Sequence, residues 1–261
     1  MSNNNMPQYK QFGSGDTTVF LLHGAYGDGR YFADLAGRLV ESGYRVIVWD
    51  CPGYGLSEPV EKPSIETFTQ AAINMIEREK TTTNIVLGHS MGALIAPLLS
   101  TQCAAVNGVI LSAGSPGFVA RTPEDQKIYL KERLEPIENG MSVSDYAKPL
   151  IKYMMAENSK GELVDQVFDV VLSMKTETFA TSIRAIAAYD SRPALRAMTV
   201  PTLLLAGSDD PACTANGMRG MSEIVQDSEF HILDAVGHYG FAEKPSEYYT
   251  VVLGFLKKRF K

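Results

Sequence analysis

The feature that most constrains this fold is the alternation of short apolar runs with longer segments of helical periodicity. The apolar runs occupy residues 17–22, 44–49, 84–88, 107–112, 201–207 and 228–233. Helical patterns occupy residues 29–42, 64–80, 91–104, 214–225 and 244–260. Because parallel strands need a crossover between them, this alternation predicts an α/β fold with a mostly parallel central sheet flanked by helices. Pro97 is expected to kink the third helix or loosen one of its turns.

One interval breaks this rhythm. Residues 115–190 contain no strand-like run, only amphipathic helical patterns such as EDQKIYLKERLEPI. Open α/β folds bind their ligands at the carboxyl edge of the sheet, so we expect this interval to form a helical cap over that edge, inserted after the strand at 107–112. The expected domains are therefore a core of residues 1–114 and 191–261 and a cap of residues 115–190.

Composition and charge limit the partners. A chain of 261 residues fits one catalytic domain, and its net charge of -6 argues against nucleic acid or an acidic membrane surface as the main partner. A small, largely neutral substrate is compatible with these values. No apolar run approaches the roughly 18 to 20 residues that a membrane span requires. We expect a cytoplasmic protein, with monomer and homodimer both open.

The three cysteines carry no sign of a metal site or a disulfide framework. Cys51, Cys103 and Cys213 are an odd number and include no CxxC pair. We interpret all three as small buried hydrophobic side chains. No metal and no organic cofactor is expected.

The stretch GHSMG, residues 88–92, is the strongest functional signal. It follows an apolar strand and opens a helix, which is the context of a nucleophile elbow with Ser90 at its tip. Side chains two residues before and after the serine would collide with neighbouring backbone, which explains Gly88 and Gly92. The first helical N–H, that of Met91, is placed to stabilise an oxyanion. The alternative is that Ser90 is only a turn residue. In that case no histidine and no carboxylate need lie at the same edge of the sheet.

Four histidines are available as the base that a serine nucleophile needs. His89 should point off the opposite side of the elbow, His231 should pack within its strand, and His23 belongs to the first loop. His238 lies in a glycine-flanked loop after the last predicted strand, at the carboxyl edge of the sheet. We therefore predict that His238 is the base, with a pKa near the ordinary value of about 6.5.

The acid is expected after the strand at 201–207, where the turn GSDDPACT offers Asp209 and Asp210 at the same edge. Turn formation explains one aspartate and leaves the other available to orient the histidine. From the turn alone either residue could be the acid.

Taken together, these segments resemble the α/β-hydrolase superfamily over essentially the whole chain except the cap. The resemblance rests on LLHGAYGDG (21–29), WDCPGYGLSEP (49–59), GHSMGA (88–93), VPTLLLAGSDDP (200–211) and GHYGFAEKP (237–245). The chain order serine, aspartate, histidine is also that of the superfamily. The resemblance implies that Ala25 supplies the second oxyanion N–H and that Asp210, three residues after Gly207, is the acid. It also implies that the turn at 50–57 is structural.

Within the superfamily the chain looks most like small-molecule carboxylesterases and enol-lactonases. Serine at the elbow argues against the haloalkane dehalogenase and epoxide hydrolase branches, which use aspartate there. Ala93 stands where glycine is frequent, and Tyr26, expected to contact substrate, follows the oxyanion residue where members vary. A further set of residues either lines the pocket with Tyr26 or forms the core of the cap: Tyr129, Met154, Met155 and Phe168.

The expected reaction is hydrolysis of a small carboxylic ester or lactone through an acyl-enzyme on Ser90, with His238 as base and Asp210 holding its imidazole. A C–C bond hydrolase, an acyltransferase or a cofactor-free perhydrolase would use the same three residues. A ligand-binding receptor on a hydrolase fold is a third possibility.

Overall fold

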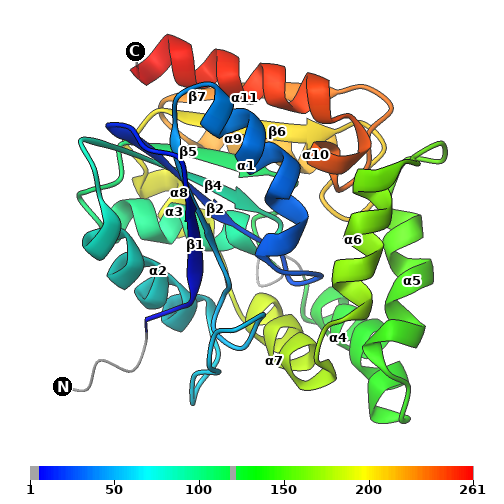
Figure 1. The fold of residues 1–261 in the computed structure, drawn as a ribbon. Coiled ribbons are helices and arrows are strands. Elements are labelled where there is room, and N and C mark those ends of the chain that lie inside the picture. The colour runs from blue at the N-terminus through cyan, green and yellow to red at the C-terminus, as the bar shows by residue number, and fades with distance from the viewer. Residues whose placement is uncertain (1–5, 118–121, 261) are drawn as a thin grey trace.

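The protein is built around a seven-stranded sheet with the order β1-β3-β2-β4-β5-β6-β7 (Figure 1). The computed structural model describes residues 6–117 and 122–260. The strands are β1 (Tyr9–Phe12), β2 (Thr17–Leu22), β3 (Arg45–Trp49), β4 (Thr83–His89), β5 (Gly108–Ser112), β6 (Thr202–Gly207) and β7 (Ser228–Leu233). All neighbouring strands pair in parallel except β1, which is antiparallel to β3. The mostly parallel sheet expected from the sequence is confirmed.

Strand β1 was not expected from the sequence. Its residues YKQF are mostly exposed, and it pairs only with β3, with Tyr9 opposite Trp49. An edge strand open to solvent needs no apolar run, so the pattern that marks the buried strands is missing here. The six expected strands all form, and β4 extends to His89 so that Ser90 follows it directly.

Helices cover both faces of the sheet (Figure 1). Helices α1 and α11 pack together on one face, and α3 packs with α2 and α8 on the other, where α9 also contacts α8. Helix α3 runs without interruption through Pro97. The bounds of the elements around the sheet are η1 (Gly29–Phe32), α1 (Ala33–Glu41), α2 (Ile65–Glu79), α3 (Met91–Gln102), α8 (Arg192–Ala197), α9 (Ala215–Ile224), α10 (Gly240–Glu243) and α11 (Pro245–Phe260).

Between β5 and α8 the described residues form four helices, which we call the helical insertion. They are α4 (Pro123–Glu138), α5 (Val143–Met154), α6 (Glu162–Leu172) and α7 (Thr176–Ala187). Helix α4 packs on α7, and α5 packs on α6. Helix α6 also contacts η1 and α10, which follow the carboxyl ends of β2 and β7. The helical insertion therefore lies beside the carboxyl edge of the sheet, to the right and below it in Figure 1.

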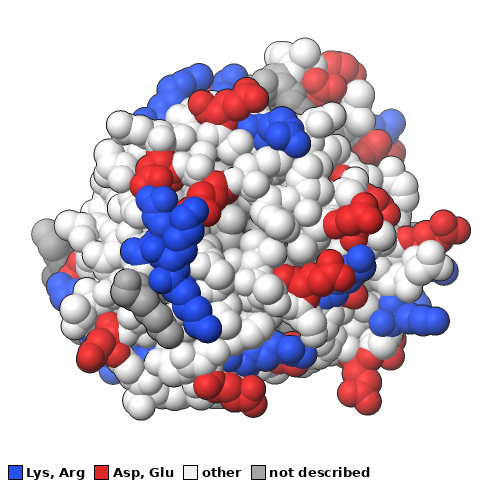
Figure 2. Space-filling model, turned by 90° about the horizontal axis from the view of Figure 1, so that it is seen from above, with Lys and Arg blue, Asp and Glu red and all other residues white. Residues whose placement is uncertain are grey.

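The surface carries charges of both signs. On the face seen in Figure 2, lysine and arginine side chains lie among aspartate and glutamate side chains, separated by uncharged areas. Within the described ranges, no helix has both the length and the apolar character needed to cross a membrane.

Candidate active site

Ser90 lies in a strained turn between β4 and α3. Its backbone has φ 55° and ψ -110°, and it is one of only three non-glycine residues with positive φ in the described ranges. Such a conformation is costly for a residue with a Cβ and persists only where the surroundings enforce it. The Ser90 N–H donates to Ser112 O at 2.9 Å, and Ala93 N–H donates to Ser90 O at 2.9 Å.

The two glycines of the elbow have a steric explanation. A Cβ on Gly88 would lie 2.2 Å from Gly92 O, and a Cβ on Gly92 would lie 2.2 Å from Leu22 O. Both obstacles are backbone atoms, which cannot move aside as a flexible side chain can. The first turn of α3 therefore packs directly against the ends of β4 and β2, as the sequence pattern predicted.

Asp210, and not Asp209, meets His238. His238 Nδ1 lies 2.7 Å from Asp210 Oδ2, and both side chains are buried. Asp210 Oδ1 accepts the backbone N–H groups of Ala212 and Cys213 at 2.8 and 2.9 Å, which fixes the carboxylate. Asp209 is exposed and accepts a hydrogen bond from the Ser208 hydroxyl. With Nδ1–H donating to the carboxylate, Nε2 of His238 is left as a proton acceptor.

The pairing shifts both pKa values. Burial by itself lowers the pKa of His238, but the charge and hydrogen bond of Asp210 outweigh burial and raise the pKa to about 10. Burial by itself raises the pKa of Asp210, but His238 and two backbone N–H groups outweigh it and hold the pKa below its usual range. The pKa of His238 therefore lies above the value near 6.5 that the sequence analysis expected.

Ser90 and His238 line one cavity of about 220 Å³. The cavity is also bounded by Ala25, Tyr26 and Met91 from the core, and by residues of α4 and α5. Of the insertion residues whose role was open, Tyr129 and Met154 line the cavity. The other two, Met155 and Phe168, do not line it and pack in or against the hydrophobic core.

The loop that carries Ala25 is held by buried polar contacts. His23 Nδ1 lies 2.8 Å from Gly24 O, and Cys51 N–H donates to His23 Nε2 at 2.9 Å. Burial lowers the pKa of His23, which agrees with a neutral ring that donates from Nδ1 and accepts at Nε2. The Tyr54 hydroxyl donates to Ala25 O at 3.1 Å. These contacts give His23 a structural role and orient the Ala25 peptide at the cavity.

The remaining two histidines lie in different environments. His89 is buried against the rings of Phe32, Tyr239 and Phe241, and burial lowers its pKa well below the usual value. The expectation of a packed His231 is wrong. His231 is exposed, because β7 is the outer strand of the sheet and its ring faces solvent.

Glu243 is a site residue that the sequence analysis missed. Its carboxylate accepts the backbone N–H groups of Gly237 and Tyr239, on either side of His238, at 3.0 and 2.8 Å. It also accepts Ala156 N–H at 2.8 Å and the Ser159 hydroxyl at 2.5 Å, both just beyond α5. His238 N–H in turn donates to Met154 O at 2.8 Å. Glu243 therefore ties the histidine loop to the helical insertion.

Cys213 corrects another expectation. Cys51 and Cys103 are buried as expected, but Cys213 is only half-buried and lines the cavity beside His238. The ligand atoms of Asp210, Cys213 and His238 lie within 4.8 Å of one another, so these residues could approach a metal ion. However, two ligands of a tetrahedral zinc ion lie about 3.3 Å apart, whereas the His238 and Asp210 atoms are 2.7 Å apart. That spacing is typical of a hydrogen-bonded pair.

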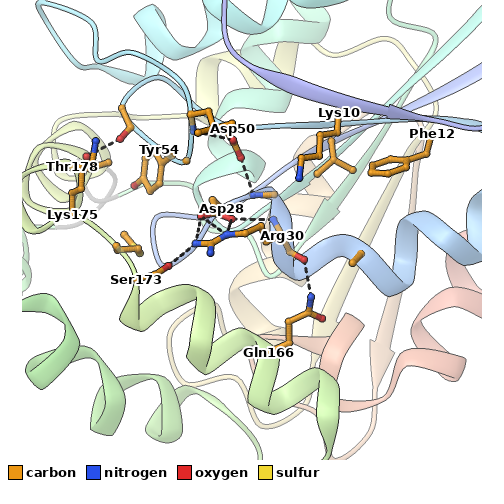
Figure 3. A pocket seen from close by; sticks show the side chains of 17 residues that line it. Lys10, Phe12, Asp28, Arg30, Asp50, Tyr54, Gln166, Ser173, Lys175 and Thr178 are labelled. Atoms are coloured by element: carbon orange, nitrogen blue, oxygen red, sulfur yellow. Dashed lines mark hydrogen bonds and ion pairs between the residues drawn. The ribbon is translucent and has the colours of Figure 1, made fainter.

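A larger cavity of about 680 Å³ lies elsewhere on the molecule and is shown in Figure 3. It is bounded by β1, η1, the loop after β3 and the connection between α6 and α7. Arg30 crosses it, donating to Asp28 of the core and to Ser173 of the helical insertion (Figure 3). Among the described residues, the two cavities share no lining residue. Because Ser90 and His238 line only the smaller cavity, the smaller cavity is the candidate active site, although this one is larger.

Comparisons with known proteins show which family and which hydrolases this chain resembles. The family described as serine aminopeptidase, S33, matches residues 13–245. The chain is 26% identical to 3-oxoadipate enol-lactonase 1 of Acinetobacter baylyi over 84% of this chain and 80% of that protein. It is 27% identical to a 2-hydroxy-6-oxononadienedioate/2-hydroxy-6-oxononatrienedioate hydrolase of Escherichia coli over 96% and 90% of the two chains.

Among solved structures, an esterase from Exiguobacterium antarcticum aligns with a TM-score of 0.85 at 23% identity, covering 95% of this chain and 94% of the other. This likeness confirms the fold class expected from the sequence, that of the α/β-hydrolases.

The two neighbouring aspartates give a sharp test. Asp210→Asn should lower kcat by about 100- to 10000-fold, because the imidazole loses the carboxylate that orients it. It should also shift the midpoint of the remaining pH–activity curve to lower pH, because the group that raises the pKa of His238 is gone. The matched control Asp209→Asn should cost less than about tenfold. The reverse order of the two effects would assign the acid to Asp209.

Glu243 gives a second test. Glu243→Gln replaces an oxygen acceptor by an NH₂ group facing backbone donors, so the histidine loop should shift. Because small displacements of a catalytic group cost up to about 100-fold, we expect kcat to fall by about 10- to 100-fold with a smaller change in KM. The control is Glu247→Gln, because Glu247 lies on the surface, where its carboxylate is 3.6 Å from Lys244 Nζ. Steady-state kinetics equal to wild type in Glu243→Gln would show that Glu243 does not position His238.

Proposed function

Because the chain belongs to the serine aminopeptidase S33 family of hydrolases, we propose that it cleaves a small carboxylic ester or lactone, with Ser90 as nucleophile. The observation that carries the proposal is that Ser90, in its strained turn, and His238, paired with the buried Asp210, line the same cavity. A base oriented by a carboxylate, beside a serine at a helix N-terminus, is the arrangement that acyl transfer to serine requires.

The reaction proceeds in two halves. Ser90 Oγ attacks the carbonyl carbon while His238 Nε2 takes the hydroxyl proton, and the oxyanion accepts hydrogen bonds from the N–H groups of Met91 and Ala25. The intermediate then expels the alcohol, which receives the proton from His238. Water next attacks the acyl-enzyme with His238 again as base, releasing the acid and restoring Ser90. Each oxyanion donor is worth about 100- to 1000-fold in rate.

The helical insertion acts as a cap in this proposal, with residues 115–190 as the cap and residues 1–114 and 191–261 as the core. Tyr129 and Met154 bring the insertion to the cavity, and Tyr26 faces it from the core as the expected substrate contact. A cavity of about 220 Å³ favours a small substrate. The cytoplasmic location, the choice between monomer and homodimer and the lack of a nucleic acid partner stay predictions from the sequence.

A second candidate function is hydrolysis of a C–C bond. It is supported by relatives whose names denote a 2-hydroxy-6-oxononadienedioate/2-hydroxy-6-oxononatrienedioate hydrolase. The two functions share Ser90, Asp210 and His238 and differ in the bond that is broken. Product analysis separates them. An ester or lactone yields an acid and an alcohol, whereas C–C bond hydrolysis yields an acid and a second product whose leaving carbon has gained a proton.

A fluorophosphonate probe tests the nucleophile. The probe should label the wild-type protein and fail to label Ser90→Ala, because the reactive hydroxyl is gone. Ser115→Ala is the matched control, since Ser115 lines the same cavity but does not lie on the elbow. Labelling should be read as intact-protein mass, and hydrolysis of p-nitrophenyl esters of graded chain length and of simple lactones should be lost in parallel. Equal labelling of Ser90→Ala would refute the assignment.

A further inference from the structure

Arg133 is a largely buried cation in the cavity that contains Ser90. Its side chain is 16% exposed, and its Cζ lies 4.0 Å from the centroid of the Tyr129 ring. A guanidinium stays charged at all accessible pH values, and burying a charge is costly unless an anion is paired with it. The partners of Arg133 therefore show whether protein groups alone neutralise its charge or whether a ligand must do so.

Those partners are weak. Within ion-pair distance of Arg133 lies the carboxylate of the adjacent Glu132, whose side chain is 64% exposed, at 3.4 Å from Nη1. The carbonyl oxygen of Tyr129 lies 3.5 Å from the same Nη1. Both distances lie beyond the usual range for a hydrogen bond. Within the described part of the chain, no carboxylate other than that of Glu132 pairs with Arg133. The parallel donors Nε and Nη2 form the edge that binds a carboxylate in bidentate fashion.

The hydroxyl of Tyr26 is a second polar group of the cavity without a well-formed hydrogen bond. It is buried and meets no described partner at hydrogen-bond geometry, while the Tyr26 ring packs on Phe179 with centroids 5.0 Å apart. Burial raises the pKa of Tyr26 well above its usual value, and the charge and side chain of Arg133 act in the opposite direction. The Tyr26 hydroxyl in turn acts to lower the pKa of Tyr146, so the three side chains adjoin. A buried donor left unsatisfied costs free energy that an acceptor from a ligand would recover.

We propose that Arg133 and the Tyr26 hydroxyl form a carboxylate-binding subsite beside Ser90, so that the substrate is an ester or lactone bearing a free carboxylate. The inference rests on the proposed function, because it concerns the substrate of the same site. One carboxylate supplies acceptors to both Arg133 and Tyr26, and Tyr26 directly follows Ala25, the proposed oxyanion residue. The carboxylate itself does not react; it fixes the position of the carbonyl that Ser90 attacks.

Size and charge narrow this class further. The cavity of about 220 Å³ is small for a ligand site, so the carboxylate and the scissile carbonyl belong to one short molecule. The net charge of -6 repels anions at long range, and the carboxylates of Asp125 and Glu132 also border the cavity. Binding of an anionic substrate therefore depends on the local Arg133, and the proposal differs here from the largely neutral substrate that the sequence suggested.

The test compares two esters of matched shape. Ethyl hydrogen succinate carries a carboxylate where ethyl isocaproate carries an isopropyl group, and pH-stat titration measures hydrolysis of both. The readout is the ratio of kcat/KM for the anionic ester to that for the neutral ester. We expect a ratio of about 10 or more in the wild type, reduced by about 10- to 100-fold in Arg133→Met, chiefly through KM.

Further variants separate the possible causes. Tyr26→Phe should lower the ratio less than Arg133→Met, Arg133→Lys should give an intermediate ratio, and Glu132→Gln should raise it by removing a competing carboxylate. Lys131→Met is the matched control, since Lys131 lies exposed on the same helix and does not line the cavity, and its ratio should equal that of the wild type.

Each outcome decides one claim. A wild-type ratio near 1, or equal loss of both esters in Arg133→Met with the ratio preserved, overturns the carboxylate subsite while the proposed hydrolase function stands. If neither these two esters nor the p-nitrophenyl esters and lactones are hydrolysed by folded wild-type protein, the proposed function itself is wrong and the subsite is rejected with it.

Discussion

The strained backbone at Ser90 is the constraint on which the rest of the structure depends. A positive φ at a residue with a Cβ persists here because β4 ends directly before it, α3 begins directly after it and Ser112 O holds its N–H. The close packing that results leaves no room for side chains at Gly88 and Gly92. Ser90 and Met91, the first residue of α3, both line the cavity. In the proposed mechanism this one turn therefore supplies both the nucleophile and an oxyanion donor.

The parallel sheet then determines which distant residues can reach that serine. Loops after β6 and β7 end at the same edge as the loop after β4, so Asp210 and His238 come to Ser90 from far along the chain. The charge and hydrogen bond of Asp210 raise the pKa of His238 against the effect of burial, which by itself lowers it. Glu243 extends this network to the helical insertion, which links the position of the base to the helices that close the cavity.

Much of the site could be predicted from the sequence because its key residues stand in local motifs directly after strands. Ser90, Asp210 and His238 each follow an apolar run, and the structure brings the last two together at the distance expected of a hydrogen bond. The residues that were missed depend on contacts that no local pattern encodes. Arg133 and Glu243 stand in ordinary amphipathic sequence, where periodicity does not reveal which neighbour a side chain meets. Strand β1 and the exposed His231 were misjudged because edge strands lack the buried pattern.

The central claim is that Ser90 carries the acyl group during turnover, and a pre-steady-state experiment with p-nitrophenyl acetate tests it most directly. Rapid mixing should show an initial burst of p-nitrophenol approaching one equivalent per active chain, followed by slower steady release, because acylation of Ser90 precedes hydrolysis. Acid quenching during the steady phase, followed by peptide mass spectrometry, should place the acetyl group on Ser90. An acetyl group on Cys213 or any other residue, or turnover with neither burst nor acylated peptide, would contradict the account.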